Sequence, residues 1–267
     1  MARRSTPPFR ADHVGSLLRP PALHQARASY AAGAITADQL RQAEDDAIRA
    51  AVRMQEETGL QSATDGEFRR AEWHTDFITQ LGGFRQAETF RTIAFLNDPA
   101  WRQQAAGTGL DPEHQHEINL GVINQALAGR PDGLTVTVHM CRGNYRSAWF
   151  SSGGYDFVAE TVFSGLAADG YFLEYDDDRS GSFEPLRFVP PGKIVVLGLV
   201  TTKTPVLESP DDLKRRVEQA ARYVDADRLC LSPQCGFAST VEGNALTFDQ
   251  ERAKLDLVVQ TATALWG

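Results

Sequence analysis

From residue 134 onward the chain alternates between short apolar runs and amphipathic stretches, and this alternation limits the fold more than any other feature. Strands are predicted at residues 134–139, 171–174, 194–200 and 228–231, and helices at 156–168, 210–223 and 248–266. Strands separated by helices of this length form βαβ units with a parallel sheet. Right-handed crossovers then place the carboxyl ends of these strands at one edge of the sheet, which carries the active site in a (β/α)8 barrel.

The first half of the chain is less regular. Helices are predicted at residues 36–58, from a Thr36 cap to a stop at Gly59, at 70–81 and at 111–129. Strands near residues 12–16 and 61–65 bring the number of predicted strands to six, whereas a closed barrel needs eight. Residues 84–109 offer no strand with its own crossover helix.

Composition narrows the class of protein. A net charge of −8 argues against a nucleic-acid-binding surface, which needs clustered basic residues. No apolar run approaches the roughly 20 residues that span a bilayer, so no membrane partner is expected. The amino terminus is basic without the apolar stretch of a signal peptide, and a cytoplasmic enzyme is the resulting prediction. Three cysteines do not make a disulfide framework, so each thiol is either a buried filler or a working group.

Four side chains with metal-binding chemistry stand at the ends of predicted strands. His139 and Cys141 alternate along one strand and face the same side, Glu174 ends the next strand, and Cys235 follows the last one. An imidazole, two thiolates and a carboxylate are ligand types of tetrahedral zinc. Taken singly, such residues are more often packed side chains or a solvated carboxylate than metal ligands, and the metal-site prediction depends on their shared edge of the sheet. Cys230 lies between two leucines inside a strand and is predicted to be a buried structural cysteine.

Several segments also resemble the cobalamin-independent methionine synthase family, and more narrowly the short bacterial homologues that hold only its carboxyl-terminal catalytic barrel. The resemblance runs almost without a break from residue 127 to 267 and includes two segments at the front of the chain. The segments that carry it are HMCRGN at 139–144, FLEYDDDRSG at 172–181, LSPQCGF at 231–237, DHVGSLLRP at 12–20 and DGEFRR at 65–70.

This resemblance implies an α/β fold, a TIM-type (β/α)8 barrel, with zinc held by His139, Cys141, Glu174 and Cys235. In the family the zinc binds the sulfur of homocysteine, and the thiolate takes a methyl group from a methylated folate. The family pattern further implies that Ser16 and Glu67 hold the amino-acid end of the substrate.

The acidic loop after Glu174 supplies the remaining site predictions. Asp176, Asp177 and Arg179 lie beside the predicted metal and are expected to orient ligands or substrate groups, although a solvated acidic loop is an equally good interpretation. We assign Glu67 and Asp176 to catalysis, and Ser16, Glu67, Asp177 and Arg179 to substrate binding.

One region departs from the family pattern. About two βα units are absent between Glu67 and His139, so we predict a single domain over residues 1–267 with six recognisable units and an internal deletion near residues 84–95. The missing part includes the aspartate that binds the substrate amino group in the family, and Asp98 does not occupy its motif position. Residues 201–203, Thr-Thr-Lys, stand where the family has a histidine. A homo-oligomer that covers the open edge, a remodelled barrel and a segment omitted from this sequence are three explanations that remain open.

The resulting functional prediction is a zinc-dependent thiol alkyltransferase. The leading reaction is methyl transfer from 5-methyltetrahydrofolate, in its polyglutamate form, to homocysteine, giving methionine. One alternative is transfer of another electrophile, such as an epoxide, to a different thiol. The other is a non-catalytic homologue that keeps zinc for folding. The expected partners are therefore a small thiol and a methyl or alkyl donor.

Overall fold

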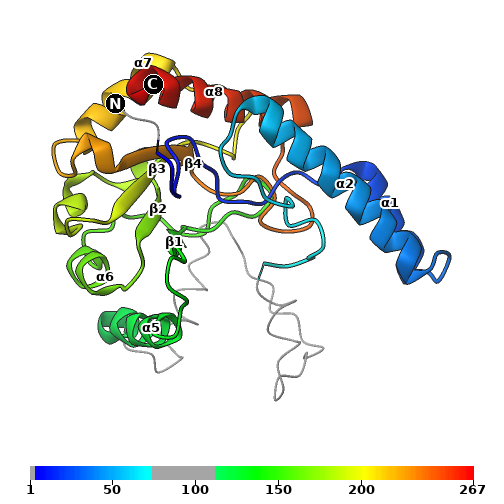
Figure 1. Ribbon diagram of the computed structural model, residues 1–267, viewed down its shortest axis with the longest axis horizontal. Helices are drawn as coiled ribbons and strands as arrows, with labels where there is room; N and C mark the ends of the chain where they lie inside the picture. Colours follow the sequence, from blue (N-terminus) through cyan, green and yellow to red (C-terminus); the bar gives the residue numbers. More distant parts are fainter. Residues whose placement is uncertain (1–3, 74–111) are drawn as a thin grey trace.

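Four parallel strands form the central sheet of the structure, a computed structural model that describes residues 4–73 and 112–267. The strands are β1 (Thr137–Met140), β2 (Gly170–Glu174), β3 (Ile194–Val200) and β4 (Leu229–Pro233), and they pair in the order β1-β2-β3-β4 (Figure 1). An isolated parallel bridge joins Ala11 to Leu231 on the far side of β4. The predicted run of parallel βαβ units is confirmed in this half of the chain.

The helices that cover this sheet are α6 (Ala159–Gly165), α7 (Pro210–Ala220) and α8 (Phe248–Trp266), with short 3-10 turns at Asp178–Ser180, Glu184–Phe188 and Ala226–Arg228. Each long helix starts at a hydroxyl cap. Ser209 accepts a hydrogen bond from the Asp212 amide at the start of α7, and Thr247 forms a capping box with Gln250 at the start of α8. These caps determine the residues at which α7 and α8 begin, after the loops that follow β3 and β4.

Three further helices are described outside this unit: α1 (Pro21–Ala31), α2 (Ala37–Thr58) and α5 (Pro112–Leu127). The predicted bounds of α2 are confirmed by its capping box at Thr36 and by Gly59, whose φ of 90° ends the helix in the left-handed conformation. Helices α1 and α2 pack together and extend away from the sheet (Figure 1). No helix in the described ranges is long and apolar enough to cross a membrane.

Side chains along each strand alternate between the two faces of the sheet, and each face packs into a different hydrophobic cluster. Residues such as Tyr171, Val195 and Leu231 point toward the helices and belong to the main hydrophobic core. Burial of an aliphatic side chain such as Val195 or Leu231 contributes on the order of 1.5–3 kcal/mol. The opposite face carries a smaller cluster of Phe172, Ile194, Val196 and Cys230, packed with Val14. Because Cys230 is fully buried in this second cluster, the prediction that it is a structural cysteine is confirmed.

Two predicted strands in the front of the chain are wrong. Residues 12–16 and 61–65 form no strand, although the Asp12 amide donates to the Leu231 carbonyl at 3.0 Å beside the isolated bridge at Ala11. The backbone of Thr64 instead bonds to the side chain of Gln55, which donates to the Thr64 carbonyl at 2.9 Å and accepts from its amide at 2.9 Å. A helical side chain thus satisfies polar groups that a neighbouring strand would otherwise have to pair.

Two other predictions fall largely on parts of the chain without a description. Residues 70–73 of the helix predicted at 70–81 are not helical, and the rest of that helix lies outside the described residues. The deletion predicted near residues 84–95 also lies outside them.

Candidate metal and thiol site

His139 reaches the inner face of the sheet because it alternates with Val138 and Met140, which pack against the main core. The register pairs His139 with Phe172, and the Nδ1 atom of His139 donates to the Phe172 carbonyl at 3.2 Å. A carbonyl oxygen can only accept, so Nδ1 is the donor in this contact, and in the neutral imidazole Nε2 carries the lone pair. Nε2 is buried and has no hydrogen-bond partner among the described residues.

Cys141 and Cys235 meet next to this imidazole, with their sulfur atoms 3.6 Å apart. The Gly143 amide donates to the Cys141 sulfur at 3.1 Å, and the Ser239 hydroxyl lies 3.5 Å from the Cys235 sulfur. Contact with the Cys141 thiol and with His139 lowers the pKa of Cys235 well below its ordinary value, whereas the contact with Cys235 raises the pKa of Cys141. The contact between the two thiols therefore favours the thiolate form at Cys235 over that at Cys141.

His139, Cys141 and Cys235 form one compact donor set. Their ligand atoms all lie within 4.8 Å of one another. Burial by itself lowers the pKa of His139, but the interactions with Cys235, the Phe172 carbonyl and Glu174 together outweigh that effect and raise it. The structure thus brings together three of the four predicted metal ligands, from the ends of β1 and β4.

Glu174, the fourth predicted ligand, is not part of that donor set. Its side chain is fully buried at the end of β2, and polar groups surround its carboxylate. Oε1 accepts from Arg179 Nη2 at 3.0 Å and from Lys203 Nζ at 3.1 Å, and Oε2 accepts from the Arg142 amide at 2.7 Å. Two cations and an amide therefore compensate the buried charge.

Arg142 fixes the loop that follows Cys141. Its guanidinium donates to the carbonyls of Gly153 and Glu174 at 2.6 and 3.0 Å, and it stacks 4.3 Å from the ring centre of Tyr155. The Tyr155 hydroxyl in turn donates to the Met140 carbonyl at 3.0 Å. This network holds the loop of Cys141 against the neighbouring strand, as the supporting contacts of a metal site must.

The donor set opens into a cavity of about 610 Å³. Two further predicted site residues, Ser16 and Glu67, line the same cavity, together with the aromatic side chains Trp73 and Phe150. Glu67 has a positive φ of 58° and forms an ion pair with Arg70, which also donates to the Ser239 carbonyl at 2.9 Å. The cavity thus combines sulfur and nitrogen donors, apolar walls and a charged pair.

Ser16 touches the loop of Cys235 directly. The Phe237 amide donates to the Ser16 carbonyl at 2.9 Å, and a Cβ atom at Gly236 would stand only 1.8 Å from the Ser16 hydroxyl oxygen. Only glycine leaves room for this approach. The first segment of the chain therefore positions the loop that carries Cys235.

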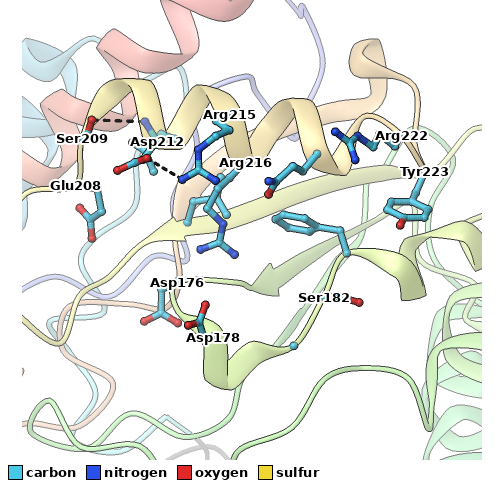
Figure 2. Close-up of a pocket in the computed structure, with 15 residues that line it drawn as sticks. Asp176, Asp178, Ser182, Glu208, Ser209, Asp212, Arg215, Arg216, Arg222 and Tyr223 are labelled. Carbon is cyan, nitrogen blue, oxygen red and sulfur yellow. Dashed lines mark hydrogen bonds and ion pairs between the residues drawn. The ribbon is translucent and has the colours of Figure 1, made fainter.

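The acidic loop lies on another side of the sheet edge. Asp176 Oδ2 lies 3.5 Å from Lys203 Nζ, and Asp177 accepts from the Arg179 amide at 3.0 Å. Asp176 lines a second cavity of about 590 Å³ between this loop and α7, in which Figure 2 shows Arg216 reaching toward Asp176 and Asp178. Burial lowers the pKa of Arg216. Asp176 and Asp177 are thus not among the residues that line the cavity of the donor set.

Several residues of the site were missed in the sequence. Lys203, Asn144 and Ser239 were not assigned, although Asn144 donates to the Gly236 carbonyl at 2.8 Å and to the Ser239 hydroxyl at 3.1 Å. Asn144 belongs to the HMCRGN segment that carries the resemblance, so its place in that segment was a usable signal. Lys203 had no comparable signal, because its carboxylate partners lie on a neighbouring strand end.

Comparisons with known proteins agree with the resemblance. Residues 113–263 match the family described as "Cobalamin-independent synthase, Catalytic domain". The chain is 40% identical to the uncharacterized protein YxjG of Bacillus subtilis strain 168, over an alignment of 364 residues that covers 99% of this chain and 96% of that protein. Because this alignment is longer than the 267 residues of the chain, part of YxjG faces no residue here. The chain is also 25% identical to the methionine synthase of Thermococcus kodakarensis over 125 residues, which are 46% of this chain and 33% of that protein.

Solved structures give the same result for the fold. A Listeria monocytogenes protein proposed to be a vitamin-B12-independent methionine synthase matches with a TM-score of 0.72 and 29% identity, covering 99% of this chain and all of that one. A B12-independent methionine synthase from Shewanella sp. W3-18-1 matches with a TM-score of 0.69 and 19% identity over 96% of this chain and 97% of that one, which bears on the fold alone. The four parallel strands are therefore part of a TIM-type barrel fold.

Proposed function

Because the chain belongs to the cobalamin-independent methionine synthase family, we propose that it is a zinc-dependent methyltransferase that transfers a methyl group from a methylated folate to homocysteine. The observation that carries this proposal is the convergence of His139 Nε2 with the sulfur atoms of Cys141 and Cys235 in one cavity. The methionine synthase name of the Thermococcus relative supports the choice of reaction.

The residues present fit a zinc ion. Nε2 of His139 is a buried nitrogen with a free lone pair and no hydrogen-bond partner among the described residues. Contact with Cys141 and His139 favours the thiolate form of Cys235 next to that nitrogen. Imidazole nitrogen and cysteine thiolate are ligands that bind zinc in preference to harder cations.

A bound zinc ion would act as a Lewis acid that lowers the pKa of a substrate thiol, so that its proton would be released to solvent and a nucleophilic thiolate would remain. The residues of the chain hold and orient the reactants. The Phe172 carbonyl fixes the tautomer and ring orientation of His139. Ser16 and the Glu67–Arg70 pair offer a hydroxyl, a carboxylate and a guanidinium to the amino and carboxylate groups of the thiol substrate.

In the proposed transfer, the substrate sulfur attacks the methyl carbon of the donor. A sulfur–carbon bond forms as the nitrogen–carbon bond of the donor breaks, and the electron pair of the broken bond stays on the donor nitrogen, which takes up a proton. Trp73 and Phe150 supply apolar surface to the wall of the cavity in which the transfer would take place.

The direct test is to incubate the zinc-loaded protein with homocysteine and 5-methyltetrahydrofolate triglutamate and to measure methionine by mass spectrometry. The Cys235→Ser variant should form none, and the Cys230→Ala variant, which changes a buried cysteine outside the donor set, serves as the matched control. Zinc-edge X-ray absorption with and without homocysteine adds a second readout, because an open site gains a sulfur ligand. Methylation of a different thiol, or transfer from an epoxide with no reaction of the folate, would favour the alternative alkyl transfer. A zinc shell that ignores every thiol would mean a structural metal.

A further inference from the structure

The second cavity, of about 590 Å³, lies beside α7 and is separate from the cavity of the donor set. Helix α7 forms one wall, and the loop that follows β2 forms the other. No residue that lines this cavity also lines the cavity of the donor set. Its volume is in the range of sites that bind small molecules.

Some of the charged groups in this cavity already neutralise one another or a neighbour. Glu208 Oε2 lies 3.3 Å from Lys254 Nζ, and Asp212 Oδ1 lies 2.7 Å from Arg215 Nη2. These pairs need no charge from a ligand.

Arg216, in contrast, has no counter-ion in contact with it. Its side chain is partly buried, and its guanidinium carbon lies 5.3 Å from the ring centre of Phe183. It forms no ion pair or hydrogen bond with the described residues, whereas a charged side chain that leaves water is usually paired. Figure 2 shows its guanidinium pointing toward Asp176 and Asp178.

The two carboxylates that Arg216 faces also have free positions to accept hydrogen bonds. Asp176 is only 2% exposed, and its Oδ1 atom, 3.6 Å from Arg179 Nη2, has no hydrogen-bond partner among the described residues. The Asp178 carboxylate lines the cavity and has no hydrogen bond or ion pair within the described part of the chain. A guanidinium and two carboxylates therefore face one another in this cavity without pairing directly.

Apolar side chains continue the cavity wall next to these charges. Phe183, Leu199 and Leu213 line the cavity and belong to the main hydrophobic core. Tyr223 and Arg222 lie at the other end of α7 from Ser209 (Figure 2). The site thus offers a cation and carboxylates on opposite walls, with an apolar surface beside them.

We propose that this cavity binds a free amino acid with an apolar side chain, whose carboxylate pairs with Arg216 and whose ammonium pairs with Asp176 and Asp178. A zwitterion carries both charges on one small group and so completes both sides of the cavity. A simple anion would instead meet the two carboxylates, and a simple cation would meet the guanidinium. The apolar side chain of the ligand would lie against Phe183 and Leu213. The inference does not depend on zinc or on the proposed function.

The test is isothermal titration calorimetry of the full chain with L-leucine, L-methionine and L-phenylalanine. At least one of them should bind saturably, with one site per chain. The tightest binder is then compared with the amine and the acid that lack one of its charges, which for leucine are 3-methylbutylamine and 4-methylpentanoate. Each analogue should bind roughly tenfold more weakly or worse, because it loses one charge-assisted contact.

Variants assign each charge to its side chain. Arg216→Met should weaken binding of the amino acid but leave that of the amine unchanged. Asp178→Asn should weaken binding of the amino acid and of the amine but not that of the acid. Lys214→Met changes a cation of α7 that does not line the cavity, and it should bind like wild type. Thermal unfolding of each variant checks that it is folded.

The Cys235→Ser variant separates this cavity from the donor set, because a thiol substrate is itself an amino acid in the proposed function. Binding of the amino acid should persist in Cys235→Ser and weaken in Arg216→Met. The reverse pattern would place the amino acid in the cavity of the donor set and would overturn the inference. An absence of binding by all three amino acids would overturn it as well, and so would an acid that binds as tightly as the amino acid.

Discussion

The sulfur atoms of Cys141 and Cys235 lie 3.6 Å apart, although 94 residues separate them along the chain. Cys141 directly follows β1, and Cys235 lies in the loop after β4. Arg142 anchors the loop of Cys141 and Ser16 anchors the loop of Cys235, and Asn144 joins the two loops by donating to the Gly236 carbonyl. The pair is therefore produced by the whole fold and not by a local motif, and its chemistry can be tested residue by residue.

The first prediction concerns the metal itself. Cys235→Ser removes the sulfur that contacts both Cys141 and His139, so we expect zinc content to fall from one ion per chain to near zero. Inductively coupled plasma mass spectrometry of the purified variants measures this. Cys230→Ala should keep its zinc, because Cys230 packs with Phe172 and Val196 outside the donor set. Full zinc content in Cys235→Ser would refute the assignment of Cys235 as a ligand.

A second prediction concerns thiol reactivity. Contact with Cys141 lowers the pKa of Cys235, and the thiolate is the reactive form, so in the metal-free protein iodoacetamide should modify this pair first, beginning with Cys235. Zinc should protect both residues. Cys230 should stay unmodified in either state, because burial raises the pKa of its thiol to about 12. Peptide mass spectrometry over a time course measures each site. Modification of Cys230 ahead of the pair, or equal rates with and without zinc, would contradict this assignment.

The third prediction tests the contact between the first segment and the Cys235 loop. In Gly236→Ala the new Cβ would stand 1.8 Å from the Ser16 hydroxyl, so the loop must move and zinc content should drop. Ser16→Gly removes that hydroxyl, and the double variant should recover part of the zinc. Gly121→Ala is a suitable control, since no atom lies within 4 Å of its added Cβ. If Gly236→Ala binds zinc like wild type, the close packing of these loops is not needed for the site.

A fourth prediction links stability to pH through Glu251. This carboxyl is buried in α8 and accepts from the Leu18 amide at 2.9 Å, and burial raises its pKa to about 8. Below pH 4.5 it is protonated in both states. As the pH rises toward 8 the unfolded chain loses the proton while the folded protein keeps it, so the free energy of unfolding falls.

Glu251→Gln keeps the acceptor for Leu18 but cannot ionise. The variant should therefore be more stable than wild type at pH 8, by roughly 1–4 kcal/mol, with a much smaller difference at pH 5. Urea denaturation at the two pH values measures both differences. A difference that does not change between pH 5 and pH 8 would show that Glu251 is not the titrating group.

The elements with a strong periodic signal were predictable from the sequence. The bounds of β3 at residues 194–200 and of α8 at 248–266 agree with the prediction, because a β-branched apolar run and a capped amphipathic stretch depend on few distant contacts. Helix α1 was missed because it buries only Leu23 and so has no apolar stripe to detect. The strand expected at residues 61–65 failed for a tertiary reason, since the Gln55 side chain pairs the backbone there.

The candidate site divides in the same way. His139, Cys141 and Cys235 could be predicted because strand alternation and parallel order determine which side chains share an edge. The environment of Glu174 could not. Its partners Arg179 and Lys203 come from loops whose paths depend on tertiary contacts, such as the anchoring of Thr202 by Gln234. Sequence position thus indicated which residues meet, but not which of them would be neutralised by neighbouring cations.

The order of the strands implies that a metal bound to the donor set would also stabilise the sheet. β1 and β4 are the first and last of the four strands and share no hydrogen bonds with each other, yet they bring in the three donors. An ion bound to His139, Cys141 and Cys235 would link the end of β1 to the loop after β4, although these two strands do not pair with each other. Occupancy of the site would then resist fraying of β1 by mass action. Loss of the ion would therefore weaken the pairing of β1 in the sheet, in addition to removing the site that binds the thiol.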